Sequence, residues 1–301
     1  MEINFFAEAL AEICRHSSAG RTSPAGRTSP DKQSLRWLVI ANPAAGGFTM
    51  RSRRKKCRRA LEQCLMEARK NPLREDCAPA GAACLSGKQA ETGGNPALAA
   101  YGLVQTTGHG SAAKYTHALI EEAKTHNAPF YLVISAGGDG TSREILSALY
   151  HTPAEARANM AILRLPMGTG NDGADSSDLA DALMFLIKPS RIGFNPALRL
   201  VTAPGGQAAL NHPSCLAFNI LSVGLDAFVT HMTNKMKGKL PGDSYKLWVD
   251  IAALLYDRLY TVDFLDVKAD GGAVSFREKI LLLAVGVSGH RTYGSQKKIL
   301  P

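Results

Sequence analysis

One pattern occurs four times in succession in the first part of the sequence: a short apolar segment, a turn and a helical segment. The apolar segments cover residues 35–41, 103–107, 130–135 and 160–165, and polar residues do not alternate along them. Such strands are expected to be buried on both faces, and the helices between them predict a three-layer α/β domain with a parallel sheet. In a sheet of this kind the turns after the strands meet at the carboxyl edge, where ligands bind.

The pattern ends near residue 194, and segments typical of β-strands follow it. They predict a second, antiparallel β-rich domain of the sandwich type over residues 195–301, with one helix at about residues 244–259. The α/β domain is then expected to cover residues 35–194. The strands expected in the second domain cover residues 198–203, 214–222, 260–268, 273–276 and 279–287.

Two segments lack the composition of a packed core. Residues 1–34 contain the hexapeptide Ala-Gly-Arg-Thr-Ser-Pro twice, and we expect a flexible N-terminal segment there. Within it, an apolar stripe that includes Phe6, Leu10 and Ile13 predicts a short helix, either loosely packed or used as a membrane anchor. Residues 71–100 are rich in Gly, Ala and Pro and are expected to form a mobile insertion.

The formal net charge of +9 favours an anionic partner, such as phosphate groups, anionic lipid headgroups or nucleic acid. No apolar run reaches the roughly 18 residues of a membrane-spanning helix, and the N-terminus lacks the basic and apolar regions of a secretory signal. The six cysteines form no Cys-x-x-Cys pair, so no zinc site is expected. These features predict a cytoplasmic protein with reduced thiols.

The strongest local signal is residues 137–141, here named the first glycine loop, with the sequence Gly-Gly-Asp-Gly-Thr after a predicted strand. Gly137, Gly138 and Gly140 let the backbone approach a phosphate chain closely, and the start of the following helix attracts anions. An aspartate in such a loop repels phosphate unless a cation lies between them, so Asp139 is expected to bind Mg²⁺ directly or through water. The alternative is a tight turn in which Asp139 caps the helix.

Residues 168–172, the second glycine loop, have the sequence Gly-Thr-Gly-Asn-Asp and follow the next predicted strand. Its glycines Gly168 and Gly170 are expected to bring backbone N–H groups to the phosphate chain. Thr169 and Asn171 can donate hydrogen bonds to phosphate or to a nucleobase. Asp172 has two open roles, one in catalysis and one as a cap of the following helix.

These motifs resemble the catalytic domain of the diacylglycerol kinase family, which includes bacterial lipid kinases and sphingosine kinases. The resemblance rests on Asn-Pro-x-x-Gly from Asn42 to Gly46 and on the two glycine loops, in this order on successive strands, and it extends over about residues 36–301. Weaker matches lie in the β-rich domain, at residues 218–226 and 284–294. The resemblance implies a kinase that uses ATP and Mg²⁺ to phosphorylate a lipid hydroxyl, such as that of diacylglycerol.

The resemblance also implies roles for individual residues. Glu144, one turn into the helix after the first glycine loop, would support the site through hydrogen bonds, unless it is simply an exposed helix charge. Thr106 is assigned because it lies four residues before Gly110-Ser111-Ala112, which is matched to the family's Gly-Asp/His-Ala motif. A second alignment register matches residues 108–110, Gly-His-Gly, to that motif instead. The nucleotide contacts carried over by the resemblance are Asn42, Thr106, Gly137, Gly138, Asp139, Gly140, Thr141 and Thr169.

The chain departs from the family's pattern at three places. Gly173 stands where the family usually has Phe, and Ser142-Arg143 stands where it often has Leu-Asn. The family continues beyond the region that ends here at Pro301, with an Asp-Gly-rich segment that carries a glutamate as general base. The β-rich domain is therefore expected to be truncated, and no residue is assigned as general base.

The segment from Arg51 to Arg59, inside a helix predicted at residues 50–70, is strongly basic. Three uses are open: a solvated face, docking on an anionic membrane, and nucleic-acid binding. No aromatic residues separate the cations, which argues against stacking on nucleic-acid bases. The expected partners are ATP, a lipid substrate and an anionic membrane touched peripherally, without nucleic acid, while a homodimer stays open.

Three functions other than a lipid kinase match part of the sequence. The first is an NAD(P)-binding oxidoreductase, because Gly168-x-Gly170-x-x-Gly173 formally fits the dinucleotide-binding fingerprint. That fingerprint also requires an acidic residue at the end of a following strand about 20 residues later, and the chain has no convincing one. An NAD kinase resembles the chain in its Gly-Gly-Asp-Gly loop but lacks the second glycine loop in this form, so it ranks second. The third is a non-catalytic relative that binds nucleotide or lipid.

Overall fold

The structure is a computed structural model, and it describes residues 1–17, 35–72, 84–85, 101–124, 130–188, 192–201, 214–236, 251, 254–256, 258 and 264–287. The chain divides into two compact units, the second of which is Ala197–Gly289. Residues 18–34 of the flexible segment predicted at 1–34 lie outside the described residues, as do most of the insertion predicted at 71–100 and most of the helix predicted at 244–259.

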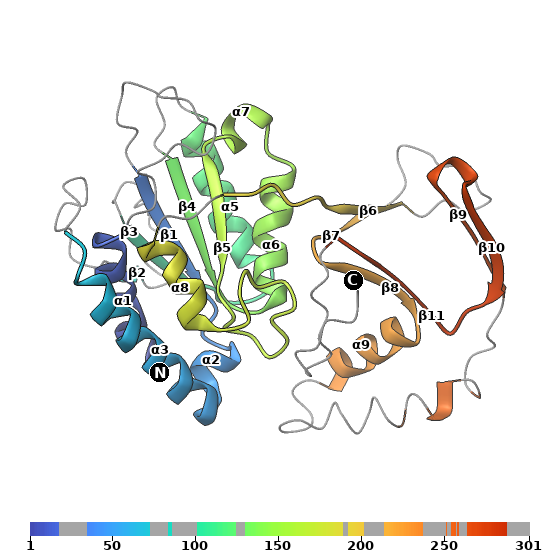
Figure 1. Cartoon of the computed structure of the whole chain (residues 1–301), viewed down its shortest axis with the longest axis horizontal. Coiled ribbons are helices and arrows are strands. Elements are labelled where there is room, and N and C mark those ends of the chain that lie inside the picture. Colours follow the sequence, from blue (N-terminus) through green and yellow to red (C-terminus); the bar gives the residue numbers. More distant parts are fainter. Residues whose placement is uncertain are drawn as a thin grey trace. The chain divides into compact units, whose positions relative to one another are not determined.

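The first unit is built around a parallel sheet with the strand order β2-β3-β1-β4-β5 (Figure 1). Strand β1 pairs in parallel with β3 on one side and with β4 on the other. The winding of the chain therefore changes direction at β1 and β4, which is where open α/β sheets bind ligands. The strands are β1 (Leu35–Ala41), β2 (Cys84–Leu85), β3 (Tyr101–Gln105), β4 (Phe130–Ala136) and β5 (Met160–Arg164).

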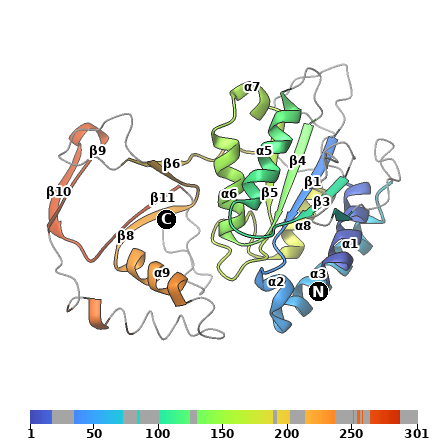
Figure 2. The same ribbon diagram turned by 180° about the vertical axis from the view of Figure 1, so that it is seen from behind.

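Helices cover both faces of this sheet (Figures 1 and 2). Trp37 and Val39 of β1 pack into the core under α1, α3 and α8, while Leu38 and Ile40 pack under α5 and α6. This alternation along one buried strand confirms the predicted three-layer α/β class. The helices are α1 (Ile3–Arg15), α2 (Gly46–Thr49), α3 (Arg51–Ala68), α5 (Ser111–Ala123), α6 (Asp139–Tyr150), α7 (Ala154–Arg157) and α8 (Leu179–Ile187).

The prediction of a flexible N-terminal segment is wrong for helix α1. Its side chains Phe6, Leu10 and Ile13 are completely buried, and α1 packs on α3 and α8. The rings of Phe6 and Phe48 meet edge to face, with centroids 5.2 Å apart. The apolar stripe thus joins the main core instead of forming a loose helix or an anchor. The predicted mobile insertion is likewise wrong at Cys84–Leu85, which pair with β3 as the edge strand β2.

The described part of the second unit includes three antiparallel strand pairs and helix α9, and the strand pairs confirm its predicted antiparallel β character. The strand predicted at residues 214–222 is in fact two strands, because the chain bends at residues 218–219 and the two parts pair with different partners. Helix α9 (Leu225–Met236) was not predicted. The pairs are β6 (Leu198–Val201) with β7 (Ser214–Ala217), β8 (Ile220–Gly224) with β11 (Leu282–Gly286), and β9 (Phe264–Ala269) with β10 (Val274–Lys279).

None of the helices in the described ranges is long and apolar enough to cross a membrane.

Asp178 joins α3 to α8 in the first unit. Its carboxylate caps α8 by accepting a hydrogen bond of 2.8 Å from the Ala180 N–H, and it lies 2.8 Å from Lys56 Nζ. The hydrogen bond from Lys56 is the largest of the effects that hold the pKa of Asp178 below its ordinary value of 3.8. The ionised carboxylate therefore stabilises the fold above that value, and the contribution is lost as the pH falls through the lowered folded-state pKa.

Replacing Asp178 by Ala is expected to lower the free energy of unfolding by about 1 kcal/mol near neutral pH, because α8 loses its N-cap. Asp178→Asn keeps a capping oxygen but loses the charge, so its free energy of unfolding should fall by less than that of Asp178→Ala. Urea denaturation near neutral pH and at about pH 2 measures both effects. Asp178→Asn and the wild type should have nearly the same free energy of unfolding at the lower pH. A difference in this free energy that persists there would contradict the assigned role of the charge.

Candidate active site

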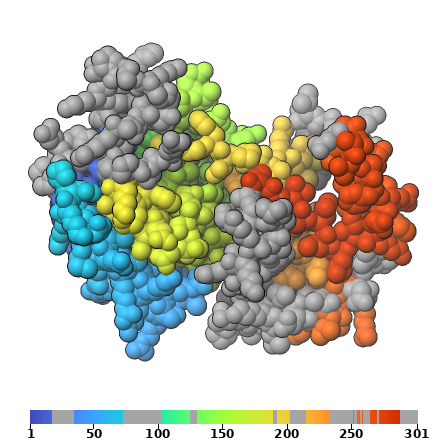
Figure 3. Space-filling view, viewed as in Figure 1, coloured from blue at the N-terminus to red at the C-terminus, as the bar shows by residue number. Residues whose placement is uncertain are grey.

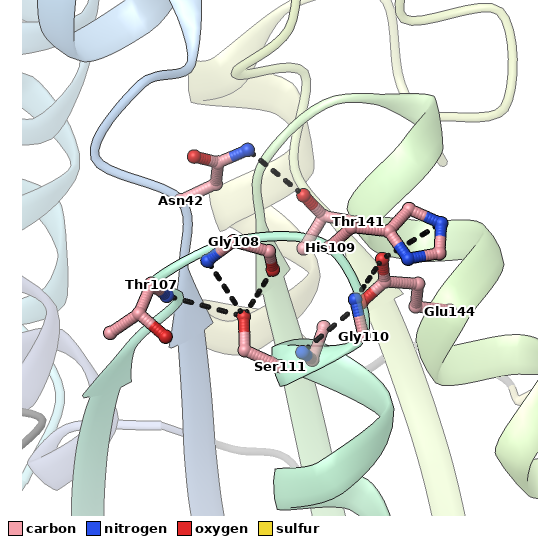
Figure 4. Close-up of polar contacts among 9 residues, drawn as sticks. Asn42, Thr107, Gly108, His109, Gly110, Ser111, Thr141 and Glu144 are labelled. Atoms are coloured by element: carbon pink, nitrogen blue, oxygen red, sulfur yellow. Dashed lines mark hydrogen bonds and ion pairs between the residues drawn. The ribbon is translucent and has the colours of Figure 1, made fainter.

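Four loops meet at the carboxyl edge of the sheet, and the loop after β1 is joined to the first glycine loop. Asn42 directly follows β1, and its backbone N–H donates to the Ala136 carbonyl at 3.0 Å. Its side-chain Nδ2 lies 3.3 Å from Thr141 Oγ1, to which it donates (Figure 4). Asn42 and Thr141, which the sequence assigned to one nucleotide site, are therefore in direct contact.

The first glycine loop leads straight into helix α6, whose N-cap is Gly138. A methyl carbon at Gly137 would lie 2.4 Å from Thr141 Oγ1, so only glycine fits there without displacing that side chain. The N–H groups in the first turn of a helix have no partner within the helix, and they make this end of α6 a place for an anion. Asp139 is the first residue of the helix and Gly138 is its N-cap. The alternative of Asp139 as the helix cap is therefore wrong.

The second glycine loop is shaped by its own asparagine. Asn171 has a positive φ of 63°, its Oδ1 accepts a hydrogen bond of 2.7 Å from the Gly168 N–H, and its Nδ2 donates to the Pro166 carbonyl at 3.2 Å. Its amide thus folds the loop, a role that the sequence did not suggest. The alternative of Asp172 as the cap of α8 is wrong, because Asp178 is that cap.

The two glycine loops touch each other through their backbones. A methyl carbon at Gly168 would lie 2.5 Å from Gly138 Cα, and one at Gly170 would lie 3.0 Å from Asp139 Oδ2. The other carboxylate oxygen of Asp139 accepts a hydrogen bond of 2.9 Å from the Gly173 N–H. Asp139 is therefore held where the loops meet, and Thr169 lies in the adjoining loop.

The departure from the family's pattern at Gly173 falls at this same point. A methyl carbon at Gly173 would lie 3.2 Å from Asp139 Oδ1 and 3.7 Å from Arg164 Nη1. Arg164 Nε donates to Asp175 Oδ1 at 3.0 Å, and the Arg164 N–H donates to Asp175 Oδ2 at 2.7 Å. These two hydrogen bonds fold the chain after β5 into a loop, and from this loop the Gly173 N–H donates to Asp139.

Glu144 holds the loop between β3 and α5 against α6. Its Oε1 accepts from the Gly110 N–H at 2.8 Å and its Oε2 accepts from the Ala112 N–H at 3.1 Å (Figure 4). The alternative of a merely solvent-facing charge is therefore wrong. His109, one of the residues of the second alignment register, is almost fully exposed, and its Nε2 lies 3.9 Å from Glu144 Oε1. Thr106, the choice of the first register, donates its N–H to the Ala41 carbonyl at 2.8 Å.

Arg53 belongs to the same edge, although the sequence pattern indicates it only as one cation of the basic helix. Its guanidinium donates to the backbone carbonyls of Gly168 and Thr169. The helical spacing indicates this inward position, because Arg53 precedes the buried residues Cys57, Ala60 and Cys64 at helical intervals. Cations are so dense around this helix that the inward position of Arg53 is not evident from the charge pattern.

Comparisons with known proteins identify the family of the chain. The family model of the diacylglycerol kinase catalytic domain matches residues 36–187. The chain is 29% identical over 193 residues to a "Probable lipid kinase YegS-like" of Enterobacter sp. (strain 638), covering 64% of this chain and 56% of the relative. A protein of the same name from Yersinia pestis (strain Pestoides F) is 32% identical over 142 residues, which are 46% of this chain and 41% of that protein.

The chain thus spans about half the length of the curated relatives that it matches. Among solved structures, it is similar to a diacylglycerol kinase from Bacillus anthracis str. Sterne, with 20% identity, coverage of 87% of this chain and 67% of that one, and a TM-score of 0.45. The match of the family model takes in half of the chain and all of the loops described above. On that match, the chain belongs to the family that carries the diacylglycerol kinase catalytic domain.

Proposed function

We propose that this protein is an ATP-dependent lipid kinase, which transfers the γ-phosphate of ATP to a hydroxyl group of diacylglycerol or a related lipid. The observation that carries the proposal is the backbone contact between the two glycine loops, with Asp139 held between them. The family of the chain supports it, as do the two relatives, whose names describe lipid kinases.

The residues at the carboxyl edge have separate tasks in this proposal. The free N–H groups at the start of α6 and in the second glycine loop bind the phosphate chain, since oriented backbone donors favour anions. Glu144 and Asn171 keep their loops in shape through the hydrogen bonds already described. The residues that line the nucleotide are Asn42, Thr106, Gly137, Gly138, Gly140, Thr141, Gly168, Thr169 and Gly170.

Asp139 is the residue proposed to hold Mg²⁺, directly or through water. Mg²⁺ is usually bound by one or two carboxylates together with waters and substrate phosphates, and Asp139 supplies an exposed carboxylate beside the phosphate loops. When bound, the ion neutralises charge on the phosphates, which is most of what phosphoryl transfer requires. The protein fixes the carboxylate through the Gly173 N–H, and no described residue is assigned as general base.

A basic face on α3 is proposed to bring the enzyme to its lipid. Six cations of this helix are exposed, five of them besides Lys56, which pairs with Asp178, and the segment that contains them forms open surface of the first unit (Figure 3). Anionic lipid attracts such clusters with about 1 kcal/mol for each cation near the surface. A cytoplasmic location with peripheral membrane contact belongs to this proposal. The basic face consists of Arg51, Arg54, Lys55, Arg58 and Arg59.

The test is a kinase assay with the purified protein, radiolabelled ATP, Mg²⁺ and diacylglycerol in phospholipid vesicles. Labelled phosphate is expected on the lipid, and turnover should be faster on vesicles with anionic phosphatidylglycerol than on neutral ones, with the difference reduced by salt. The variant Arg54→Ser/Arg59→Ser should lose this preference while it keeps its turnover on neutral vesicles.

The other outcomes distinguish the rival functions. Transfer of label to NAD instead of lipid would favour an NAD kinase. Binding of ATP without transfer to any acceptor would favour a non-catalytic relative. Equal turnover on neutral and anionic vesicles would leave the kinase proposal standing and remove the role of the basic face.

A further inference from the structure

Arg53 is an arginine on the inward side of an otherwise solvated basic helix. It shares this side of α3 with Cys57, Ala60 and Cys64, all of which are buried. Arg53 is half-buried, whereas the other cations from Arg51 to Lys56 are exposed. A cation placed on the inward face of an amphipathic helix needs polar partners there, because its burial without them would cost free energy.

The partners of Arg53 are two successive backbone carbonyls of the second glycine loop. Nη1 donates to the Gly168 carbonyl, and Nη2 donates to the Thr169 carbonyl at 3.1 Å. The stem of the side chain crosses the loop after β1, since a methyl carbon at Gly46 would lie 3.5 Å from Arg53 Cδ. Helix α2 is also joined to the chain just before the second glycine loop, since the Gly47 N–H donates to the Met167 carbonyl at 2.8 Å. The guanidinium thus joins helix α3 to the second glycine loop.

The two hydrogen bonds from Arg53 set the direction of two backbone donors, the N–H groups of Thr169 and Gly170. In a planar trans peptide the C=O and the following N–H point in opposite directions. Because the carbonyls of Gly168 and Thr169 both point to Arg53, the N–H groups of Thr169 and Gly170 both point away from it. Within the described residues neither N–H has a hydrogen-bond acceptor, and both residues are exposed. Successive N–H groups aimed to one side form a concave anion site.

We infer that Arg53 is a positioning residue for the nucleotide: it orients the N–H groups of Thr169 and Gly170 toward the phosphate chain of ATP without touching ATP itself. The inference deepens the proposed function and depends on it. The carboxylate proposed to hold Mg²⁺ lies beside this loop, since a methyl carbon at Gly170 would lie 3.0 Å from Asp139 Oδ2.

The test measures the affinities of the full chain for ATP and for adenosine by titration, in Mg²⁺ and without lipid. Arg53→Ala is expected to bind ATP about ten- to a hundredfold more weakly, as follows when charge-assisted hydrogen bonds that hold a binding loop are lost. Its affinity for adenosine should stay unchanged, because adenosine carries no phosphate. Arg53→Lys should bind ATP with an affinity between those of the wild type and Arg53→Ala, since an ammonium group does not reproduce the bidentate geometry of a guanidinium.

Arg157→Ala is the matched control, because Arg157 also donates to a backbone carbonyl, that of Tyr150, but precedes β5 at the opposite edge of the sheet. It should bind ATP as the wild type does. Unchanged ATP binding by Arg53→Ala, or an equal loss for adenosine, would overturn the inference. If Arg53→Ala does not fold, Arg53→Lys decides in the same way. A wild-type protein that binds no ATP would instead refute the proposed function.

Discussion

Phosphoryl transfer by the Asp139→Ala variant is expected to be at least about a thousandfold slower than that of the wild type, since metal-assisted charge stabilisation supplies several kcal/mol. The geometry gives the reason. The carboxylate of Asp139 lies where the two glycine loops touch, fixed by the Gly173 N–H at 2.9 Å. Its removal takes away the only negative charge assigned to Mg²⁺ in the proposal. The lipid kinase assay with saturating diacylglycerol measures the loss.

Asp139→Asn is the matched control for the structural part of this effect. It keeps an oxygen that can accept the Gly173 N–H and loses only the negative charge. Both variants should therefore be inactive, while Asp139→Asn should unfold at the temperature of the wild type. Normal turnover by Asp139→Asn would show that the hydrogen bond matters and the charge does not, and the metal assignment would then be wrong.

The sheet and its loops could be predicted because their signals are local. The apolar segments gave the strands β1, β3, β4 and β5 nearly as the structure has them. The glycine loops were recognisable because close backbone approach permits few residue types, as the contact between Gly138 and Gly168 shows. In both cases the physical requirement acts on consecutive residues, so that the sequence displays it directly.

What the sequence did not reveal depends on contacts between distant residues. An apolar stripe on α1 does not say that Phe6 will meet Phe48. The amide of Asn171 looked available to a ligand, but hydrogen bonds to Gly168 and Pro166 occupy it. Helix α9 contains Phe228, Val229 and other residues that favour helices only weakly, so its conformation depends on its surroundings. The inward direction of Arg53 could be found only by separating helical spacing from total charge.

Replacing Gly168 by Ala should disable the site through the backbone alone, without removing any chemical group. The added methyl carbon would lie 2.5 Å from Gly138 Cα and 3.0 Å from Asn171 Oδ1. No rotation of a side chain can relieve the first contact, so the two glycine loops must separate. Overpacking of this kind costs about 1–3 kcal/mol of stability, and the separation should weaken ATP binding by at least about tenfold. Thermal unfolding and ATP titration measure the two effects.

Gly140→Ala is the matched control for stability, because it adds the same methyl group in the adjoining loop, where no atom lies within 4 Å of the new carbon. Within a helix, alanine is also favoured over glycine by up to about 1 kcal/mol, so this variant should be at least as stable as the wild type. If Gly168→Ala matched the wild type in both stability and ATP affinity, the loops would not need to touch. The nucleotide would then have to be bound without the two-loop arrangement on which the kinase proposal depends.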